Sequence, residues 1–269
     1  MSISNEKEVY QHLSEGLPFT LRGSEYAEKW ALDAKRTSFS YSGDGTTIDS
    51  KNRLKLYFDT HKVGRGIWKW IHYFDIYQRH FSKFVGREVH VLEIGIYSGG
   101  SLHMWEEYFG LNCHIYGVDI EQACKAYEGD RTKIFIGDQA DREFWKGFKK
   151  QVPKVDIVID DGGHKPEQQL ITLEEMLSHL RPGGVYLCED VHGNFNNFCS
   201  FVHGLASHNN SVINNSVDKE KGNVCTPSPF QEAIHSIHFY PYAIVIERNS
   251  NPIKQFIAPK HGTEWQPFL

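Results

Sequence analysis

The chain has 269 residues, of which 40% are apolar and 13% aromatic, and its formal net charge at pH 7 is −5. This apolar content is enough to bury a core, so the composition excludes wholesale disorder and allows one large α/β domain with an N-terminal extension. No basic field is evident, which argues against a nucleic-acid partner and favours small molecules or glycans.

The cysteines and the N-terminal residues bear on the compartment. Five cysteines are scattered without C-x-x-C spacing, which argues against a disulfide framework and against a structural zinc site. The first residues are polar and lack the apolar region of a signal peptide, and no stretch approaches the roughly 18 apolar residues of a membrane helix. We therefore expect a cytoplasmic protein without a membrane partner.

The chain begins with a weakly patterned segment. We expect a short helix over 5–15 and a polar loop over 40–52, so that residues 1–52 form an N-terminal extension and 53–269 the main domain. Residues 67–84 are rich in aromatic side chains and contain neither Gly nor Pro. This stretch predicts one long buried helix.

Beyond residue 88, strand patterns alternate with helix patterns. We expect helices over 101–109, 141–150 and 165–180, the last one ended by Pro182-Gly183, and strands over 89–95, 114–120, 133–138, 155–161 and 184–190. Residues 236–249 predict two more strands joined by a Tyr-Pro-Tyr turn. The alternation indicates an α/β fold of the Rossmann-like kind, with a mainly parallel, doubly wound sheet and a C-terminal antiparallel hairpin.

In such a sheet, ligands bind beyond the carboxyl ends of the strands. The first strand is followed by a glycine-rich turn, EIGIYSGGS (93–101), which lets the backbone approach a ligand at the start of a helix. The dinucleotide fingerprint needs glycine where the chain has Glu93 and Ser98, so the turn favours a ligand without a pyrophosphate. An ordinary tight turn is the alternative. The candidate cofactor contacts here are Glu93, Gly95, Ser98, Gly99 and Ser101.

Acidic residues also end the next two strands. Asp119 ends the second strand about 20 residues beyond the turn, where an acid accepts hydrogen bonds from ribose hydroxyls. Asp138 ends the third strand and is a candidate acceptor for an adenine amino group. Each acid alone is explained equally well by a helix cap or by solvation, but one acid per strand favours a nucleoside site. Ile120, Gln139 and Asp160 complete the candidate cofactor contacts.

The most specific pattern is a pair of acidic motifs, Asp160-Asp161-Gly-Gly-His after the fourth strand and Glu189-Asp190-Val-His after the fifth. Neighbouring strands lie roughly 5 Å apart, so these carboxylates converge and repel one another unless a cation lies among them. Oxygen ligands suit a hard divalent cation such as Mg²⁺ and disfavour zinc. Such an ion binds a substrate hydroxyl, lowers its pKa and aligns it with a methyl donor.

Two histidines follow these acids. His164 lies three residues beyond Asp161, and an imidazole titrates near neutrality, so we assign His164 and Asp161 to catalysis. His192 is the alternative base and a candidate substrate contact. The structural alternative is that the acids cap the helix beginning near residue 165 or lie solvated in loops.

The ordered motifs EIGIYSGGS, YGVDI, GDQAD, DDGGH and CEDVH, preceded by IWKWIHYF, resemble a known family. They are similar to the metal-dependent sugar O-methyltransferases of macrolide biosynthesis, of the macrocin and mycinamicin type, and to the related rhamnosyl O-methyltransferase and cephalosporin-hydroxylase family. The likeness covers about residues 55–250. It implies a class I S-adenosylmethionine-dependent O-methyltransferase that uses Mg²⁺ or another hard divalent cation. The implied acceptor is a hydroxyl of a sugar, oligosaccharide or glycosylated small molecule.

The resemblance also implies roles for individual residues. The metal ligands would be Asp161, Glu189 and Asp190, with His164 as the base, and the residues holding S-adenosylmethionine would be Glu93, Asp119, Asp138 and Gln139. The helix over 67–84 would cover the cofactor, with His72 and Tyr73 as candidate contacts. The polar segment 193–235 departs from the family and is expected to be a mobile substrate loop or lid, and the N-terminal extension to build a homo-oligomer interface.

Two other functions stay open at this point. One is a hydroxylase or oxidoreductase on the same fold, although the missing dinucleotide fingerprint argues against nicotinamide and no iron-binding triad is evident. The other is a non-catalytic module that binds S-adenosylmethionine, although clustered carboxylates have no use in a dead site.

Overall fold

The computed structural model describes residues 22, 24, 26, 27, 52–193, 196–211, 214–218 and 222–264. The chain divides into two compact units, Met1–Thr47 and Ile48–Leu269. The helix expected over 5–15 lies outside the described residues, and so does the loop expected over 40–52 except for Asn52. The fold that follows is that of the second unit.

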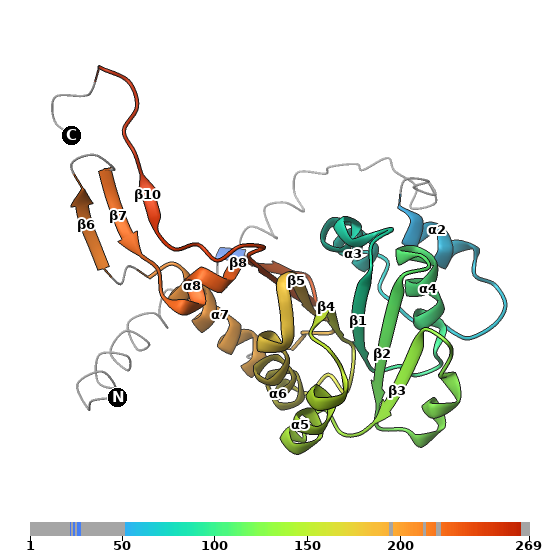
Figure 1. Ribbon diagram of the computed structural model, residues 1–269. Coiled ribbons are helices and arrows are strands. Elements are labelled where there is room, and N and C mark those ends of the chain that lie inside the picture. The colour runs from blue at the N-terminus through green and yellow to red at the C-terminus, as the bar shows by residue number, and fades with distance from the viewer. Residues whose placement is uncertain are drawn as a thin grey trace. The chain divides into compact units, whose positions relative to one another are not determined.

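A seven-stranded sheet forms the centre of this unit, in the order β3-β2-β1-β4-β5-β9-β8 (Figure 1). Its five parallel strands are β1 (Val89–Ile94), β2 (Cys113–Asp119), β3 (Thr132–Ile136), β4 (Val155–Asp160) and β5 (Leu180–Cys188). The antiparallel hairpin of β8 (Ile234–Tyr240) and β9 (Ala243–Arg248) forms one edge. The predicted fold class is confirmed, including the hairpin and its turn at Pro241-Tyr242.

Helices cover both faces of the sheet (Figure 1). The α3 face carries α2 (Arg53–Thr60), α3 (Tyr73–Phe81) and α4 (Gly100–Phe109), and the α6 face carries α5 (Arg142–Gln151), α6 (Pro166–Met176) and α7 (Asn197–Asn209). Short 3₁₀ turns occur at η1 (Ser82–Phe84), η2 (Gln122–Tyr127) and η3 (Leu177–His179). Each face has its own buried apolar cluster, so the sheet is solvent-shielded on both sides.

Strand alternation decides which side chains meet on which face. In β1, Val89 and Val91 pack on the α3 face, whereas Leu92 and Ile94 pack on the α6 face. Successive side chains of a strand point to opposite faces, so Glu93 belongs to the α3 face. Side chains at the ends of β4 and β5 alternate between the two faces in the same way. The face to which each acid points therefore determines whether it belongs to the site.

Two predicted helices have different bounds in the structure. The helix expected over 67–84 begins only at Tyr73, and residues 66–70 have no regular secondary structure. The helix expected over 165–180 ends at Met176, and Arg181-Pro182-Gly183 lie inside β5. Pro182 is tolerated there because the β4–β5 pairing is irregular over that stretch, between Val155 and Ile157.

The prediction that 193–235 is a loop is wrong. The segment contains α7, β6 (Asn214–Asp218), β7 (Gly222–Thr226) and α8 (Pro229–Ala233), and β6 and β7 form a three-stranded sheet with β10 (Phe256–Ala258). Asn196 caps α7 by accepting a hydrogen bond from the Cys199 backbone N–H. Phe198 and Val202, one helical turn apart, are fully buried on the α6 face and provide the apolar stripe that holds α7 there.

A buried hydrogen-bond network fastens α3 to the β8–β9 hairpin. His80 Nδ1 lies 2.8 Å from Glu247 Oε1, and His80 Nε2 lies 2.9 Å from the Tyr240 hydroxyl. The hydrogen bond to His80, together with nearby Lys83, lowers the pKa of Glu247 to about 2 although the carboxylate is half-buried. The network fastens the C-terminal end of α3 to both strands of the hairpin.

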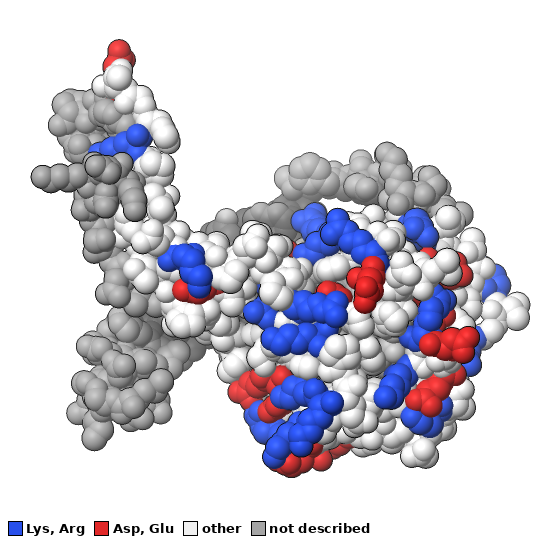
Figure 2. Space-filling model, viewed as in Figure 1, with Lys and Arg blue, Asp and Glu red and all other residues white. Residues whose placement is uncertain are grey.

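Charged side chains of both signs are interspersed on the face shown in Figure 2. On α5 and α6, for example, Arg142 pairs with Glu174 and Glu175, and Lys149 pairs with Glu175. Cys113, Cys124 and Cys188 are buried thiols. Within the described ranges, none of the helices has the length and apolar character needed to span a membrane.

Candidate active site

A cavity of about 760 Å³ opens where the five parallel strands end. Its volume is within the roughly 300–1,000 Å³ range typical of small-molecule sites. The segments that follow all five strands contribute to its wall, which is where the sheet topology predicts a ligand. Six predicted cofactor residues line it: Gly95, Ser101, Asp119, Ile120, Asp138 and Gln139. The predicted catalytic, metal and substrate residues line it as well: Asp161, His164, Glu189, Asp190 and His192.

The turn after β1 brings backbone atoms close together. Gly95 has a φ of +83°, and a Cβ built there would lie 1.9 Å from the carbonyl oxygen of Asp161. Asp119 Oδ2 accepts hydrogen bonds from the backbone N–H groups of Ile96 (2.8 Å) and Tyr97 (3.1 Å). The carboxylate predicted to bind ribose hydroxyls therefore also fixes the turn on which a ligand would rest.

Replacing Gly95 with alanine is expected to lower the free energy of unfolding by about 3 kcal/mol, because the methyl group meets backbone and φ is unfavourable. Thermal denaturation should show a Tm lower by roughly 10 °C. Gly86→Ala is the matched control, since its φ is +74° and nothing lies within 4 Å of the added Cβ. Equal losses in the two variants would contradict the close-approach argument.

Six other predicted cofactor residues do not reach the cavity: Glu93, Ser98, Gly99, Asp160, His72 and Tyr73. Gly99 has a φ of +73° as the N-cap of α4 and faces the Tyr127 ring, and Ser98 lies against Gly66. His72 Nε2 lies 3.0 Å from the carbonyl oxygen of Pro241, in the hairpin turn. These positions pack against other parts of the protein, and their direct contact with a bound cofactor stays a prediction.

Asp160 is separated from Asp161 by strand alternation. Its Oδ1 accepts a hydrogen bond from Gln139 Nε2 (3.0 Å) and its Oδ2 accepts one from the Tyr186 hydroxyl (3.1 Å). Burial raises the pKa of Asp160 to about 6, although both hydrogen bonds act in the opposite direction. Gln139 Oε1 accepts in turn from the Gly163 backbone N–H (2.6 Å). Asp160 therefore ties the loops after β3 and β4 together behind the cavity.

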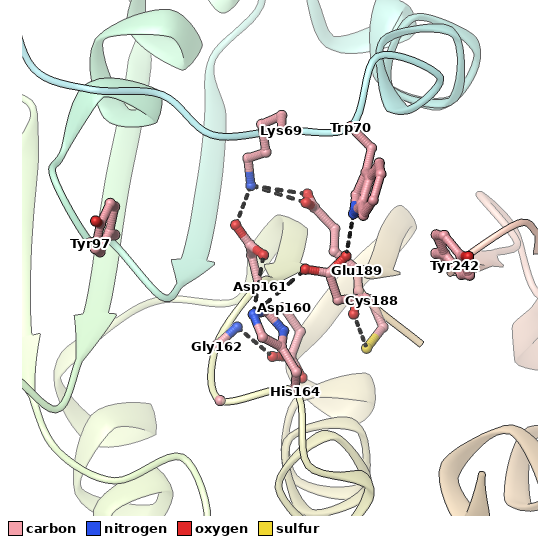
Figure 3. Close-up of polar contacts among 12 residues, drawn as sticks. Lys69, Trp70, Tyr97, Asp160, Asp161, Gly162, His164, Cys188, Glu189 and Tyr242 are labelled. Carbon is pink, nitrogen blue, oxygen red and sulfur yellow. Dashed lines mark hydrogen bonds and ion pairs between the residues drawn. The ribbon is translucent and has the colours of Figure 1, made fainter. Parts of the chain in front are cut away.

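The remaining acids gather around a lysine on the α3 face. Lys69 Nζ lies 2.5 Å from Asp161 Oδ2 and 3.1 Å from Glu189 Oε2 (Figure 3). It also lies 3.8 Å from Glu93 Oε1. The Lys69 side chain is only 3% exposed. The sequence argument expected a metal ion to offset the converging carboxylates, and in the structure an ammonium group of the chain itself lies among them.

One ammonium group only partly compensates the buried carboxyl groups of Glu93 and Glu189 and the partly exposed one of Asp161. Burial alone would lower the pKa of Lys69, but attraction to Asp161, Glu189 and Glu93 more than reverses this, so the net shift is upward and the side chain stays charged. Burial raises the pKa of Glu189 and that of Glu93 despite the nearby lysine. The centre therefore favours additional positive charge.

Residues 69–77 supply hydrogen-bond donors to the acidic centre. Trp70 Nε1 donates to Asp190 Oδ1 (2.9 Å), the Tyr73 hydroxyl donates to the same oxygen (3.0 Å), and the Tyr77 hydroxyl donates to Glu189 Oε1 (2.7 Å). Burial raises the pKa of both tyrosines, which keeps them protonated as donors. These contacts explain why the helix begins late: the residues ahead of Tyr73 stay outside the helix and reach the acids.

Asp161 and Asp190 each have one carboxylate oxygen that residues 69–77 do not contact. Asp161 Oδ1 and Asp190 Oδ2 lie 4.0 Å and 3.6 Å from His164 Nε2. One ligand atom from each of the three residues lies within 4.8 Å of the others. Two carboxylate oxygens beside an imidazole fit a hard divalent cation. Glu189 differs, because both of its oxygens contact Lys69.

Backbone strain is concentrated at this site. In the described part of the chain, positive φ among non-glycine residues occurs at Tyr97 (+49°), His164 (+57°), Asp190 (+53°) and Tyr242 (+61°). Tyr97, His164 and Asp190 line the cavity, and the Tyr242 carbonyl accepts a hydrogen bond from Tyr73, the donor to Asp190. Such conformations cost about 1–3 kcal/mol each and persist where the surroundings impose them. Their clustering supports a functional site here.

Sequence reasoning missed four residues of the site: Lys69, Trp70, Tyr77 and Tyr242. Lys69 did leave a signal, since it is the one charge in the apolar stretch IWKWI (67–71). A lysine is almost never fully buried unless it is paired, so its partners had to be acids. Trp70 and Tyr77 left no comparable signal, because aromatic residues in such a stretch are usually core.

Comparisons with known proteins agree with this geometry. Residues 92–191, which span β1 to β5 and the loops after them, match the family model of a methyltransferase domain. The chain is 34% identical over 182 residues to demethylmacrocin O-methyltransferase of Streptomyces fradiae, covering 65% of this chain and 45% of that protein. It is 34% identical over 157 residues to mycinamicin VI 2''-O-methyltransferase of Micromonospora griseorubida, covering 56% and 38% respectively.

A solved structure supports the same relationship. The MycE methyltransferase from the mycinamycin biosynthetic pathway, in complex with Mg and SAH, matches with a TM-score of 0.59 and 26% identity, covering 74% of this chain and 54% of that one. The chain thus spans about half the length, or less, of the relatives it matches. Residues 92–191 match a methyltransferase domain, and the chain is similar to the sugar O-methyltransferases of the macrocin and mycinamicin type.

Proposed function

We propose that the chain is an S-adenosylmethionine-dependent O-methyltransferase that uses Mg²⁺, or another hard divalent cation, to methylate a hydroxyl of a sugar, oligosaccharide or glycosylated small molecule. The observation that carries this proposal is the shared cavity: the free oxygens of Asp161 and Asp190 face His164 at the wall of the space that Gly95 and Asp119 also line. The two named relatives, which are a demethylmacrocin and a mycinamicin VI O-methyltransferase, support it.

The cavity residues fit the cofactor. S-adenosylmethionine supplies an electrophilic methyl group on a sulfonium. Asp119 is placed at the end of β2 to accept hydrogen bonds from its ribose, while Gly95 lets the backbone turn beneath it. Asp138 and Gln139 line the part of the cavity beyond β3, where the adenine is expected. The acidic wall suits a cationic ligand and disfavours a phosphate.

The acidic centre fits a divalent cation. Asp161 and Asp190 would hold it through the oxygens that residues 69–77 leave free, and Glu189 would join them only by sharing an oxygen with Lys69. When bound, the ion lowers the pKa of an acceptor hydroxyl and fixes its position. Lys69, Trp70 and Tyr73 keep the two aspartates in the orientation that presents these oxygens.

His164 is the proposed base. Its Nε2 would take the hydroxyl proton as the acceptor oxygen forms its bond to the methyl carbon and the carbon–sulfur bond breaks, with the electron pair going to sulfur. Asp190 Oδ2, 3.6 Å from Nε2, would stabilise the resulting imidazolium. Alignment and deprotonation are what such a transfer requires of the protein.

Metal removal tests this proposal. Dialysis against EDTA is expected to lower the release of S-adenosylhomocysteine from an acceptor-saturated reaction by at least about 100-fold, with recovery on adding Mg²⁺. Asp161→Ala and Glu189→Ala should abolish turnover while changing cofactor affinity by no more than about twofold, measured by calorimetry. Full activity after chelation would rule out the metal role and leave a metal-independent transfer.

Two other functions make different predictions. A hydroxylase or oxidoreductase would carry a redox cofactor, so nicotinamide found by mass spectrometry in the purified protein would end the proposal. A non-catalytic module would bind S-adenosylmethionine but release no S-adenosylhomocysteine with any hydroxylated acceptor. Screening sugars, oligosaccharides and glycosides with and without Mg²⁺ separates these cases. The cytoplasmic location, the homo-oligomer and the absence of nucleic-acid and membrane partners stay predictions.

A further inference from the structure

Aromatic side chains stand exposed on one side of the acidic centre. Trp70 and Tyr242 are 51% and 44% exposed, and their ring centroids lie 5.6 Å apart. The His192 ring lies 5.8 Å from that of Tyr242, and His192 lines the cavity together with Trp70. Figure 3 places Trp70 and Tyr242 on the same side of Asp161 and Glu189, with Tyr97 on the opposite side. We call Trp70, Tyr242 and His192 the aromatic rim.

The rim is held in place by hydrogen bonds to backbone and carboxylate groups. Trp70 Nε1 donates to Asp190 Oδ1. The Tyr242 carbonyl accepts from the Val191 backbone N–H (2.9 Å) and from the Tyr73 hydroxyl (3.0 Å). The His192 backbone N–H donates to the Asp190 carbonyl (3.0 Å). The three rings come from three separate segments, and each is tied to Asp190 or its neighbours.

The His72 ring lies 6.3 Å from that of Trp70 and 6.4 Å from that of Tyr242, and both rings still remain exposed, although large aromatic surfaces are normally buried. The rings of the rim are tilted to one another, by 53° between Trp70 and Tyr242 and by 79° between His192 and Tyr242. Tilted walls do not form the parallel slot that a flat aromatic ring needs. They suit a puckered ring that has apolar C–H faces and a polar edge.

Polar groups stand beside the rim, since Trp70 Nε1 donates to Asp190 Oδ1 at 2.9 Å. The free oxygens of Asp161 and Asp190 and the imidazole of His164 converge there. A ring seated against Trp70 would direct its edge at these groups, which match a ring that has several hydroxyls. We propose that the aromatic rim is the acceptor subsite and that it holds a pyranose ring through its C–H face, with a ring hydroxyl directed at the acidic centre. This inference rests on the proposed function.

Saturation-transfer NMR provides the test. The protein is saturated with S-adenosylhomocysteine and Mg²⁺, and the probe is methyl α-L-rhamnopyranoside, with catechol as the flat comparator. Irradiation of aromatic protein resonances should transfer most strongly to the C–H protons of the sugar ring. Tyr242→Asn, which removes the ring but tolerates the positive φ, should weaken glycoside binding about tenfold, and Trp70→Leu should do the same.

The matched control is Phe239→Leu. Phe239 is 41% exposed on the same hairpin, but its ring stacks on His203 at 4.5 Å and does not belong to the aromatic rim, so its loss should leave glycoside affinity unchanged within about twofold. Under turnover, Tyr242→Asn should raise KM and leave kcat within about threefold, since the ring binds but does not react.

The outcomes separate this inference from the function on which it rests. Binding of catechol in preference to the glycoside, no detectable glycoside binding by the wild type, or equal glycoside affinity in Tyr242→Asn, Trp70→Leu and the wild type would overturn the acceptor subsite. In each of these cases, retained S-adenosylhomocysteine binding and metal-dependent methylation of some hydroxyl would leave methyl transfer standing. Loss of cofactor binding in the wild type would instead overturn the proposed function.

Discussion

Replacing Lys69 with methionine is expected to lower the free energy of unfolding by about 3–5 kcal/mol and to abolish methyl transfer. The side chain is 3% exposed and contacts Asp161 and Glu189, so its loss leaves buried carboxylates without their positive partner. Thermal denaturation should show a Tm lower by roughly 10 °C. Methionine fills a similar volume, so the effect reports the charge and not a cavity.

Divalent cations should partly rescue this variant. With the ammonium group gone, Mg²⁺ or Mn²⁺ is the remaining cation for the acidic centre, so added metal should raise the Tm of Lys69→Met by several degrees more than that of the wild type. Lys149→Met is the matched control: it removes a 2.7 Å ion pair to Glu175 that is 28% and 19% exposed, and should cost less than about 1 kcal/mol. A Lys69→Met protein as stable as this control would show that the buried pairing contributes little.

The stability lost in Lys69→Met is expected to depend on pH in a defined direction. The folded-state pKa of Lys69 is raised above its ordinary value of 10.5, so the stability it contributes is present below that value and fades as the pH rises through the folded pKa. Burial raises the pKa of Glu189 to about 8, so below that pH the carboxylate gains a proton and loses the charge with which Lys69 pairs. The gap between the wild type and Lys69→Met should therefore be widest between about pH 8 and 10 and narrow toward pH 6.

The second large effect is expected at His164. His164→Asn should lower kcat by about 10²–10⁴-fold, the usual contribution of a positioned general base, with cofactor affinity unchanged within about twofold. Asparagine is the suitable replacement because the residue has a φ of +57°, which asparagine tolerates better than most side chains. Single-turnover methylation measured by S-adenosylhomocysteine release, beside calorimetry of cofactor binding, separates chemistry from binding.

Two further experiments test the role of His164: rescue of a variant by free imidazole and replacement of a second histidine. His164→Gly should regain part of its rate when free imidazole is added, because the small residue leaves room for the missing base. His192→Asn serves as the comparison, since His192 also lines the cavity and is the alternative base. A larger fall in kcat for His192→Asn than for His164→Asn would exchange the two roles.

Much of the fold followed from local patterns in the sequence. The five parallel strands are continuous apolar runs ended by acids, and the hairpin turn is marked by Pro241, so both were predictable from composition and spacing. The cavity position followed from the topology of the sheet. The prediction of a loop over 193–235 was wrong because it relied on the polar composition of the segment. Two buried side chains, Phe198 and Val202, are nevertheless enough to anchor α7 on the α6 face.

The site was harder to predict, since it depends on which way neighbouring side chains point. Asp160 and Asp161 are adjacent in sequence, yet only the second lines the cavity, because the strand ends between them and alternates its faces. Lys69 lies 92 positions from Asp161 in the chain, and no local pattern reports a contact over that separation. A tertiary contact of this kind overrides helix propensity, which is why 67–72 did not continue the predicted helix.

The unfavourable backbone angles at Tyr97, His164, Asp190 and Tyr242 have a consequence for engineering. Selection for heat resistance alone would favour glycine or asparagine at these four positions. Both residues adopt a positive φ at a lower free-energy cost than other residues, so these exchanges would raise the free energy of unfolding. The same exchanges would remove a carboxylate, an imidazole or an aromatic ring from the place where turnover is proposed to occur. Libraries built on this scaffold should hold those codons fixed and seek added robustness elsewhere.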